Sequence, residues 1–233
     1  LSDGYFLTKV PQDNQFPLHY YLSVFGAVGL TAYFGIHDTA ELKAGDTLLM
    51  SAAAGAVGSL GGQLAKNMGC HVVGMAGTDD KCQWLMDDLG FDAVINYKTE
   101  SGNLSAAIAA ACPDGVDVYF DNVGGEILDA ALLNINSNAR IVFCGSISTY
   151  NASEPVPGPY NWWQVLAKSA VVKGFLVSNY FEQFETGAGA LAQLLTEDKI
   201  QFKYEIVDGF DNTLTAFHKL FDGSNTGKLM LKV

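Results

Sequence analysis

The sequence is short of positive charge. It has 13 Lys and Arg against 25 Asp and Glu, for a net charge of −12 over 233 residues, and it holds a single arginine, Arg140. A protein that binds nucleic acid needs a basic stripe to neutralise phosphates, and nothing here supplies one. The charge balance therefore argues against a nucleic-acid partner.

Cysteines are also few, and their spacing suits no metal. None of the four forms a Cys-x-x-Cys pair or matches a set of zinc ligands, so we predict no metal site. Isolated cysteines in apolar stretches are mostly small buried hydrophobes, and a cytoplasmic location suits them best. They are Cys70, Cys82, Cys112 and Cys144.

Long apolar runs are missing as well. The longest falls well short of a membrane span, which predicts a protein that does not engage a membrane. The first residues, Leu1 to Gly4, are neither an initiator Met nor a signal peptide, so we expect a piece of a longer chain. What the sequence does have is 49% hydrophobic residues, enough for one large core.

Short apolar strands alternate with amphipathic helices through most of the chain. Strands are predicted at 46–52, 71–76, 93–97, 116–120, 141–144 and 171–175, and helices at 57–68, 78–89, 104–112 and 126–135. This alternation predicts an α/β protein with a parallel, doubly wound Rossmann sheet. Such sheets bind ligands at the carboxyl ends of their strands, where the strand order reverses.

Three segments are expected. Residues 1–45 form a helical lead-in, residues 46–200 form a dinucleotide-binding Rossmann domain, and residues 201–233 form a return segment. The last segment reads as strand, helix and strand and does not continue the earlier rhythm. We expect it to return toward a second domain that is mostly absent from this sequence.

A glycine-rich turn follows the first predicted strand and opens the first helix. It reads Ala53-x-Gly55-x-x-Gly58, one residue short of the dinucleotide fingerprint. Gly55 lets the backbone approach a pyrophosphate, and Gly58 permits close packing of helix and strand. Ala53 takes the place of the first glycine, so its backbone must avoid the left-handed region. The alternative is a tight packing turn in another α/β fold, such as that of a methyltransferase.

The end of the second predicted strand indicates which dinucleotide binds. NAD sites place Asp or Glu there to bind the ribose 2′-OH, but this chain has Gly77. Lys81, one helical turn later, offers a countercharge to a 2′-phosphate, and Tyr97 offers a hydroxyl. Asp79 and Asp80 are interpreted as first-turn residues that face solvent. The only arginine begins the fifth strand, at the opposite edge of the sheet. These residues favour NADP(H).

Four motifs resemble those of a known family. They are AAAGAVGS, GFDAVINYK, YFDNVGGE and FCGSISTYN, in this order. The sequence resembles the zinc-independent medium-chain dehydrogenases/reductases, in particular the group of prostaglandin reductase, 2-alkenal reductase and curcumin reductase. The resemblance implies NADPH-dependent reduction of the carbon–carbon double bond of α,β-unsaturated ketones and aldehydes. It also implies an amino-terminal catalytic domain that this sequence lacks, and we expect a homodimer.

The resemblance further implies four groups of cofactor contacts. The pyrophosphate, the 2′-phosphate end, the nicotinamide side and a closing segment each match residues of this chain. The pyrophosphate contacts are Gly55, Ala56, Val57 and Gly58, and those of the 2′-phosphate end are Gly77, Lys81 and Tyr97. The contacts on the nicotinamide side are Asn122, Cys144, Gly145, Ser146, Ile147, Ser148 and Tyr150. The closing segment consists of Phe175, Leu176, Val177 and Asn225.

Tyr150 is the candidate catalytic residue. Hydride transfer to an enone leaves negative charge on the carbonyl oxygen, and a hydrogen-bond donor aimed there contributes roughly 2.7–4 kcal/mol. Tyr150 follows the fifth strand in a polar loop; the alternative is that it only shapes the nicotinamide pocket. Cys144 is interpreted as a packing residue rather than a nucleophile. The aromatic loop 151–163 suits either a flat aromatic substrate or a neighbouring subunit.

Three other functions are weighed. Quinone reduction uses the same cofactor site and stays open, as does a non-catalytic NADPH-binding module. A short-chain dehydrogenase needs a Tyr-x-x-x-Lys after the glycine turn. The only such spacing, Tyr5 to Lys9, precedes the turn, so that class is excluded.

Overall fold

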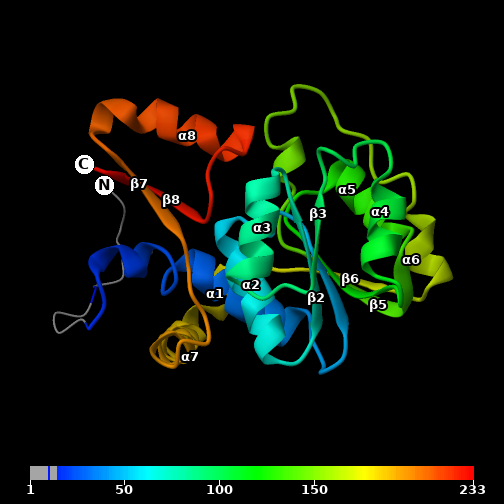
Figure 1. The fold of residues 1–233 in the computed structure, drawn as a ribbon, viewed down its shortest axis with the longest axis horizontal. Coiled ribbons are helices and arrows are strands. Elements are labelled where there is room, and N and C mark those ends of the chain that lie inside the picture. The colour runs from blue at the N-terminus through cyan, green and yellow to red at the C-terminus, as the bar shows by residue number, and fades with distance from the viewer. Residues whose placement is uncertain (1–9, 11–14) are drawn as a thin grey trace.

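The computed structural model describes residue 10 and residues 15–233 (Figure 1). The start of the predicted lead-in, residues 1–9 and 11–14, lies outside the described residues, as does the Tyr5–Lys9 spacing. No helix among the described residues is both long and apolar enough to cross a bilayer.

A six-stranded parallel sheet forms the centre of the molecule. Its strand order is β3-β2-β1-β4-β5-β6, and every neighbouring pair is parallel. The order reverses between β1 and β4, which confirms the doubly wound Rossmann topology. The strands are β1 Thr47–Met50, β2 His71–Ala76, β3 Ala93–Asn96, β4 Val116–Asp121, β5 Ile135–Phe143 and β6 Val171–Gly174.

Helices cover both faces of this sheet, and the inner strands β1, β2 and β4 bury nearly all of their side chains (Figure 1). Leu48 and Met50 of β1 face the core beneath α1, α2, α3 and α7, while Leu49 faces α4 and α5. The helices are α1 Ala27–Phe34, α2 Ala56–Asn67, α3 Asp79–Asp87, α4 Leu104–Ala111, α5 Gly125–Leu132, α6 Trp163–Ala167 and α7 Phe184–Thr196. Short 3-10 helices lie at η1 Leu18–Leu22, η3 Ile147–Thr149 and η4 Val177–Gln183, and a short π-helix lies at η2 Gly35–Thr39.

The largest difference from the predicted boundaries lies between α5 and β5. The helix expected at 126–135 ends at Leu132, and the strand expected at 141–144 already begins at Ile135. Asn134 explains the change, because its side-chain amide donates to the carbonyl of Ala130 and its backbone N–H to that of Ala131. Side chains that bond to nearby backbone in this way end helices rather than continue them.

The carboxy-terminal residues form a separate unit. β7 Tyr204–Asp208, η5 Phe210–Asn212, α8 Thr213–Asp222 and β8 Lys228–Lys232 make a two-stranded parallel pair with one crossover helix. The strand, helix and strand predicted here are therefore confirmed. Figure 1 shows this unit beside the six-stranded sheet, not as part of it. The backbone N–H of Gly227 donates to the carbonyl of Ala54, so the unit touches the glycine turn.

Candidate functional site

The residues predicted for the site share one edge of the sheet. Almost all of them directly follow a parallel strand: the glycine turn follows β1, Gly77 follows β2, and Tyr97 follows β3. Asn122 and the segment 144–150 follow β4 and β5, and the segment 175–177 follows β6. The carboxyl ends of parallel strands meet at one edge, so the structure brings these segments together there.

The glycine turn is shaped by steric limits. A Cβ on Gly58 would lie 2.5 Å from the carbonyl oxygen of Ala52 and 2.7 Å from Cα of Ala53. Only glycine allows α2 to approach the end of β1 this closely. Ala53 avoids the left-handed region, as predicted, but Ala52 adopts it with a φ of 48°. The turn therefore stores its strain one residue earlier than the fingerprint suggests.

The first turn of α2 points its backbone N–H groups out of this turn. Gly55 is the N-cap and has no side chain to accept from the helix, which leaves the N–H groups of the first turn, at Ala56 and Val57, without a capping side chain. Together with the helix dipole, such groups attract an anion. Gly55 also pairs with Gly227 in a parallel bridge, so the loop 223–227 lies against the turn.

Gly77 marks the end of the site nearest β3. A Cβ there would lie 2.7 Å from the Tyr97 hydroxyl and 3.2 Å from Cε of Lys98, so both side chains lie over this glycine. Lys81 Nζ donates to the carbonyl oxygens of Gly223 at 2.6 Å and Asn225 at 2.5 Å. Burial lowers the pKa of Lys81, and the positive charge of Lys98 lowers it further.

Lys98 was missed by sequence reasoning. It directly follows Tyr97, and its place after a strand at the ligand edge was the signal that could have found it. Asp79 and Asp80 are exposed, as interpreted from the sequence, and the Asn96 side chain donates to Asp79 at 2.6 Å. Arg140 lies at the opposite edge, where it bonds the Asp46 carboxylate at 2.6 Å.

A buried carboxyl group organises the end of β4. Asp121 is fully buried, and its Oδ1 accepts from the Tyr119 hydroxyl at 2.8 Å and from the N–H groups of Val123 and Gly124 at 3.0 and 2.9 Å. Burial raises the pKa of Asp121 despite these bonds. Its Oδ2 has no hydrogen-bond partner among the described residues. The sequence signal was an acid that ends an otherwise apolar strand.

Asn122 is held rigidly beside this carboxyl. Its backbone N–H donates to Oγ of Ser51 and its side-chain amide to the carbonyl oxygen of Ser51, both at 2.8 Å. Since Ser51 follows β1 and Asn122 follows β4, these bonds span the point where the strand order reverses. The next segment is tied to the same place, because the N–H groups of Cys144 and Gly145 both donate to the carbonyl of Asp121.

The segment 144–150 folds over two glycines. Oγ of Ser148 donates to the carbonyl of Val123 at 2.6 Å, and a Cβ on Gly124 would lie 2.5 Å from Oγ of Ser146. Ile147 lies partly exposed between these serines. Burial and the neighbouring carboxyl of Asp121 raise the pKa of Cys144 to about 12. A thiol with this pKa is not a nucleophile near neutral pH, which agrees with the packing interpretation.

Tyr150 turns back over this segment. Its hydroxyl oxygen accepts from the N–H of Ser146 at 3.2 Å, and the side chain is 61% exposed. A Cβ on Gly145 would be 3.2 Å from both this hydroxyl oxygen and the carbonyl oxygen of Asn122. Because the hydroxyl acts here as an acceptor, its own proton stays available to a ligand.

The residues after β6 separate into two environments. The Phe175 ring packs close to Gly35, beside Phe120 and Tyr180, whereas the side chain of Leu176 is largely exposed. Val177, which begins η4, packs against the core. This segment and Tyr150 lie at the β5–β6 half of the edge, and Gly77 with its lysines lies at the β2–β3 half. The two groups suit opposite ends of an extended ligand.

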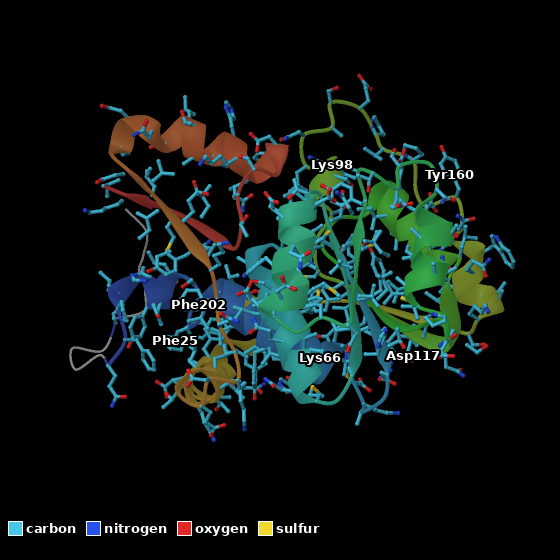
Figure 2. All side chains as sticks on the ribbon, in the orientation of Figure 1. Phe25, Lys66, Lys98, Asp117, Tyr160 and Phe202 are labelled. Atoms are coloured by element: carbon cyan, nitrogen blue, oxygen red, sulfur yellow. The ribbon has the colours of Figure 1, made fainter. Side chains whose placement is uncertain are left out.

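The aromatic loop is fixed to α5 at one point. The N–H of Asn161 donates to Oδ1 of Asp129 at 2.9 Å, and its side-chain amide donates to the carbonyl of Asp129 at 3.2 Å. Tyr160, Trp162 and Trp163 stay exposed, and Figure 2 shows Tyr160 at the outer side of α5. The choice between substrate and neighbouring subunit stays a prediction.

The comparisons with known proteins can now be set beside this geometry. A family model described as zinc-binding dehydrogenase matches residues 56–193, more than half of the chain. The chain belongs to this family. Among the described residues, no three His, Cys, Asp or Glu side chains gather as they would around a metal ion. The four cysteines are unpaired thiols, three of them buried.

Relatives place the chain more narrowly. It is 41% identical to the NADP(+)-dependent 2-alkenal reductase of Nicotiana tabacum over 95% of this chain and 64% of that protein. It is 43% identical to prostaglandin reductase 1 of Mus musculus, over 100% of this chain and 71% of that protein. The crystal structure of CurA from Vibrio vulnificus in complex with NADPH matches with a TM-score of 0.87 and 39% identity, over 94% of this chain and 66% of that one.

The predicted family group is confirmed by these relatives. The chain belongs to the group of zinc-independent medium-chain dehydrogenases/reductases that includes prostaglandin reductase and 2-alkenal reductase. It spans about two thirds of the length of the proteins it matches.

Proposed function

We propose that this chain is the NADP(H)-binding part of an oxidoreductase that reduces the carbon–carbon double bond of α,β-unsaturated ketones and aldehydes. One observation carries the cofactor assignment: Gly77 directly follows β2, where an NAD site would hold an acid, and the Tyr97 hydroxyl and Lys98 lie over it, with Lys81 near Lys98. The names of its relatives, an NADP(+)-dependent alkenal reductase and a prostaglandin reductase, support the reaction.

The residues at the sheet edge fit such a cofactor. Gly55 leaves room for the backbone to approach a diphosphate, Gly58 lets α2 pack closely on the end of β1, and the uncapped first turn of α2 attracts the negative charge of the diphosphate. Lys81 and Lys98 supply positive charge where a 2′-phosphate would lie. Asn122 and the segments 144–150 and 175–177 would line the nicotinamide end, and Asn225 would close the site from the return loop.

The proposed division of the chain follows from this site. Residues 46–200 would form the cofactor-binding domain, residues 1–45 would lead in from a catalytic domain, and residues 201–233 would return toward it. Support comes from the sheet, which lies between Thr47 and Gly174, and from the separate β7–β8 pair.

When bound, the cofactor supplies a hydride to the β-carbon of the enone. The chain's own part is to bind and orient the reactants. Tyr150 would donate its free hydroxyl proton as a hydrogen bond to the substrate carbonyl oxygen, where negative charge develops. The loop Gly145–Ser146, tied to Asp121, holds this hydroxyl in place, and the rigid Asn122 would fix the adjacent cofactor end.

Replacing the hydroxyl tests this role. In the full-length protein, Tyr150→Phe should lower turnover of an enone about 100-fold, the effect of removing one oxyanion donor, with little change in NADPH affinity. Tyr204→Phe, at an exposed position at the start of β7, is the matched control. Unchanged turnover in Tyr150→Phe would show that Tyr150 is not a catalytic residue. If the wild type reduces a quinone faster than an enone, quinone reduction would replace enone reduction as the proposed reaction.

We also propose that the protein works as a homodimer in the cytoplasm. The support is its resemblance to this enzyme group and the position of β6 as the last strand of the sheet, with Val171 exposed. Light scattering of the full-length protein tests the dimer: a mass of one chain at micromolar concentration would contradict it.

A further inference from the structure

The Asp121 carboxyl is fully enclosed at the edge of the sheet that carries the proposed site. One of its oxygens, Oδ1, accepts all of its hydrogen bonds. The hydroxyls of Tyr119 and Ser51 donate to this oxygen at 2.8 and 3.3 Å. The N–H groups of Val123 and Gly124 donate to it at 3.0 and 2.9 Å. Burying a carboxyl this completely is costly, and the bonds at Oδ1 offset part of that cost.

The bonds from the two N–H groups shape the turn 121–124, which joins β4 to α5. Gly124 adopts a φ of 71°, and a Cβ there would lie 2.5 Å from Oγ of Ser146, so the backbone reverses in a place where no side chain fits. An Asp side chain that accepts from the N–H two residues later forms an Asx turn, which fixes the backbone between them. The Asp121 carboxyl therefore sets the path of this turn.

The segment 144–150 is bonded to the same turn. Two successive N–H groups at its start donate to the carbonyl of Asp121, at 2.9 and 3.0 Å. Further along, Ser148 donates to the carbonyl of Val123 through its N–H at 3.1 Å and through Oγ at 2.6 Å. The position of the segment thus depends on the turn, and the turn depends on the carboxyl.

Tyr150, the proposed donor to the substrate carbonyl, ends this segment. Its hydroxyl oxygen accepts from the N–H of Ser146 at 3.2 Å and lies 3.2 Å from where a Cβ of Gly145 would be. Because the side chain is largely exposed, packing contributes little to its position. The place of the hydroxyl therefore depends on the backbone of residues 145–146, which is bonded to Asp121.

We propose that Asp121 is a positioning residue: its buried carboxyl fixes the turn 121–124 and, through it, holds the Tyr150 hydroxyl where the substrate carbonyl oxygen lies. This role rests on the proposed enone reduction. The Asp121 carboxyl itself stays away from the reactants because it is fully buried. A misplacement of about 1 Å in a reacting geometry costs roughly 100-fold in rate, so a residue that supports the donor from behind controls turnover.

Asp121→Ala tests the proposal in the full-length protein. It removes the acceptor that fixes the turn and should lower kcat for an enone at least about tenfold, with the KM for NADPH unchanged. Asp121→Asn keeps a carbonyl oxygen in the place of Oδ1 and should recover most of this loss. Asp117→Ala is the matched control: its carboxyl, at the other end of β4, accepts from the Thr47 N–H at 2.9 Å and the Asn136 amide at 2.8 Å, and its loss should leave kcat unchanged.

A double-mutant cycle with Tyr150→Phe separates positioning from a general structural role. If Asp121 acts through the Tyr150 hydroxyl, Asp121→Ala should lower kcat little further once that hydroxyl is gone. An equal loss in both backgrounds would overturn the proposal, as would a raised KM for NADPH with kcat unchanged. A wild type that reduces no enone would instead overturn the proposed function and, with it, this inference.

Ser148→Ala keeps the test decisive if Asp121→Ala does not fold. It removes only an exposed hydroxyl that bonds the segment to the turn. This variant should lower kcat severalfold when Tyr150 is present and not in Tyr150→Phe. Amide hydrogen exchange over residues 145–148, measured without cofactor, should speed up in Ser148→Ala and stay unchanged in Asp117→Ala. Unchanged kcat or unchanged exchange in Ser148→Ala would show that the turn does not hold the segment and would overturn the proposal.

Discussion

The six-stranded sheet and the β7–α8–β8 unit contain similar elements but bury them very differently. All four residues of β1 are buried, and its side chains reach two separate cores. In α8 only Ala216 is buried, while Leu214 is 70% exposed and Phe217 is 53% exposed. Figure 1 shows the sheet between two layers of helices and α8 on the outside of its strand pair. The six-stranded sheet is thus stabilised by its own cores, whereas the β7–α8–β8 unit is not stabilised by a core of its own.

The carboxy-terminal unit depends on contacts with α2 and α3 instead. Gln63 of α2 exchanges two hydrogen bonds with the backbone of Gln201, and Lys81 of α3 bonds the loop after α8. Lys203 lies over the Trp84 ring of α3. The proposed cofactor site lies at the join between the six-stranded sheet, whose residues are mostly buried, and the carboxy-terminal unit, whose residues are mostly exposed. Segments with few buried contacts open at low free-energy cost, which suits a loop that must admit a ligand.

The largest test of this difference replaces one phenylalanine in each region. Phe120 of β4 is fully buried, so Phe120→Ala should lower the free energy of unfolding by about 3–5 kcal/mol. Phe217→Ala in α8 removes the same ring from an exposed place and should cost no more than about 0.5 kcal/mol. Urea denaturation of both variants measures the two values. Equal losses would mean that α8 is covered in solution and that the contrast is wrong.

A second test acts on the bonds between the regions. Gln63 is buried, and its amide both donates to the carbonyl of Gln201 and accepts from its N–H, each at 2.8 Å. Gln63→Ala leaves both backbone groups without these partners and should cost about 1–3 kcal/mol.

The position of the loss matters more than its size. Hydrogen exchange should speed up in residues 201–208 and stay unchanged in β1 and β4. Uniform faster exchange throughout the chain would show that the two regions unfold as one. Gln164→Ala on α6, away from this join, is the control.

A third test concerns the pH dependence that the buried carboxyl gives to the sheet. Burial raises the folded-state pKa of Asp121, so the folded state holds this proton more tightly than the unfolded state does. The stabilisation that the protonated Asp121 carboxyl gives to the folded state is complete below the pKa of Asp121 in the unfolded chain, about 3.9. It is lost as the pH rises through the pKa of Asp121 in the folded state. Asp121→Asn does not titrate, so its stability relative to the wild type should increase over that interval.

The measurement is the difference in free energy of unfolding between the wild type and Asp121→Asn, followed from acid to neutral pH. The contributions of the other titrating groups cancel in this difference because both proteins contain them. Asp117→Asn, at the amino-terminal half of β4, serves as the control variant. A flat difference across the range would contradict the raised pKa of Asp121.

Sequence reasoning succeeded where a local pattern fixes a local structure. The helix predicted at 78–89 begins with Thr78, a residue type that caps helices, and Thr78 accepts from the N–H of Lys81 at 3.4 Å at the start of α3. The helix predicted at 57–68 ends at Asn67, and Gly69, just beyond it, adopts a left-handed φ of 82° that favours a helix end. Strand alternation predicted the topology, because parallel strands with intervening helices have few other arrangements.

It failed where the outcome depends on residues distant in sequence. Lys81 as the main cation for a 2′-phosphate stays a prediction, but the sequence did not show that its ammonium donates to carbonyls more than one hundred residues later. Asp121 was passed over because nothing local shows that its carboxyl is enclosed by Tyr119 and the Val123–Gly124 backbone. Hydrogen-bond partners across the sheet edge are a tertiary property, and periodicity carries no information about them.

The smallest predicted effect belongs to a single contact across the join. Nζ of Lys203 lies 5.2 Å from the centre of the Trp84 ring, a cation–π arrangement that links the return segment to α3. Lys203→Met keeps most of the apolar stem but removes the charge, and it should cost about 0.5–1 kcal/mol. Lys203→Arg should retain the contact. Trp84 fluorescence measured during denaturation reports on both variants. If Lys203→Met and Lys203→Arg lose stability equally, packing rather than charge holds this contact.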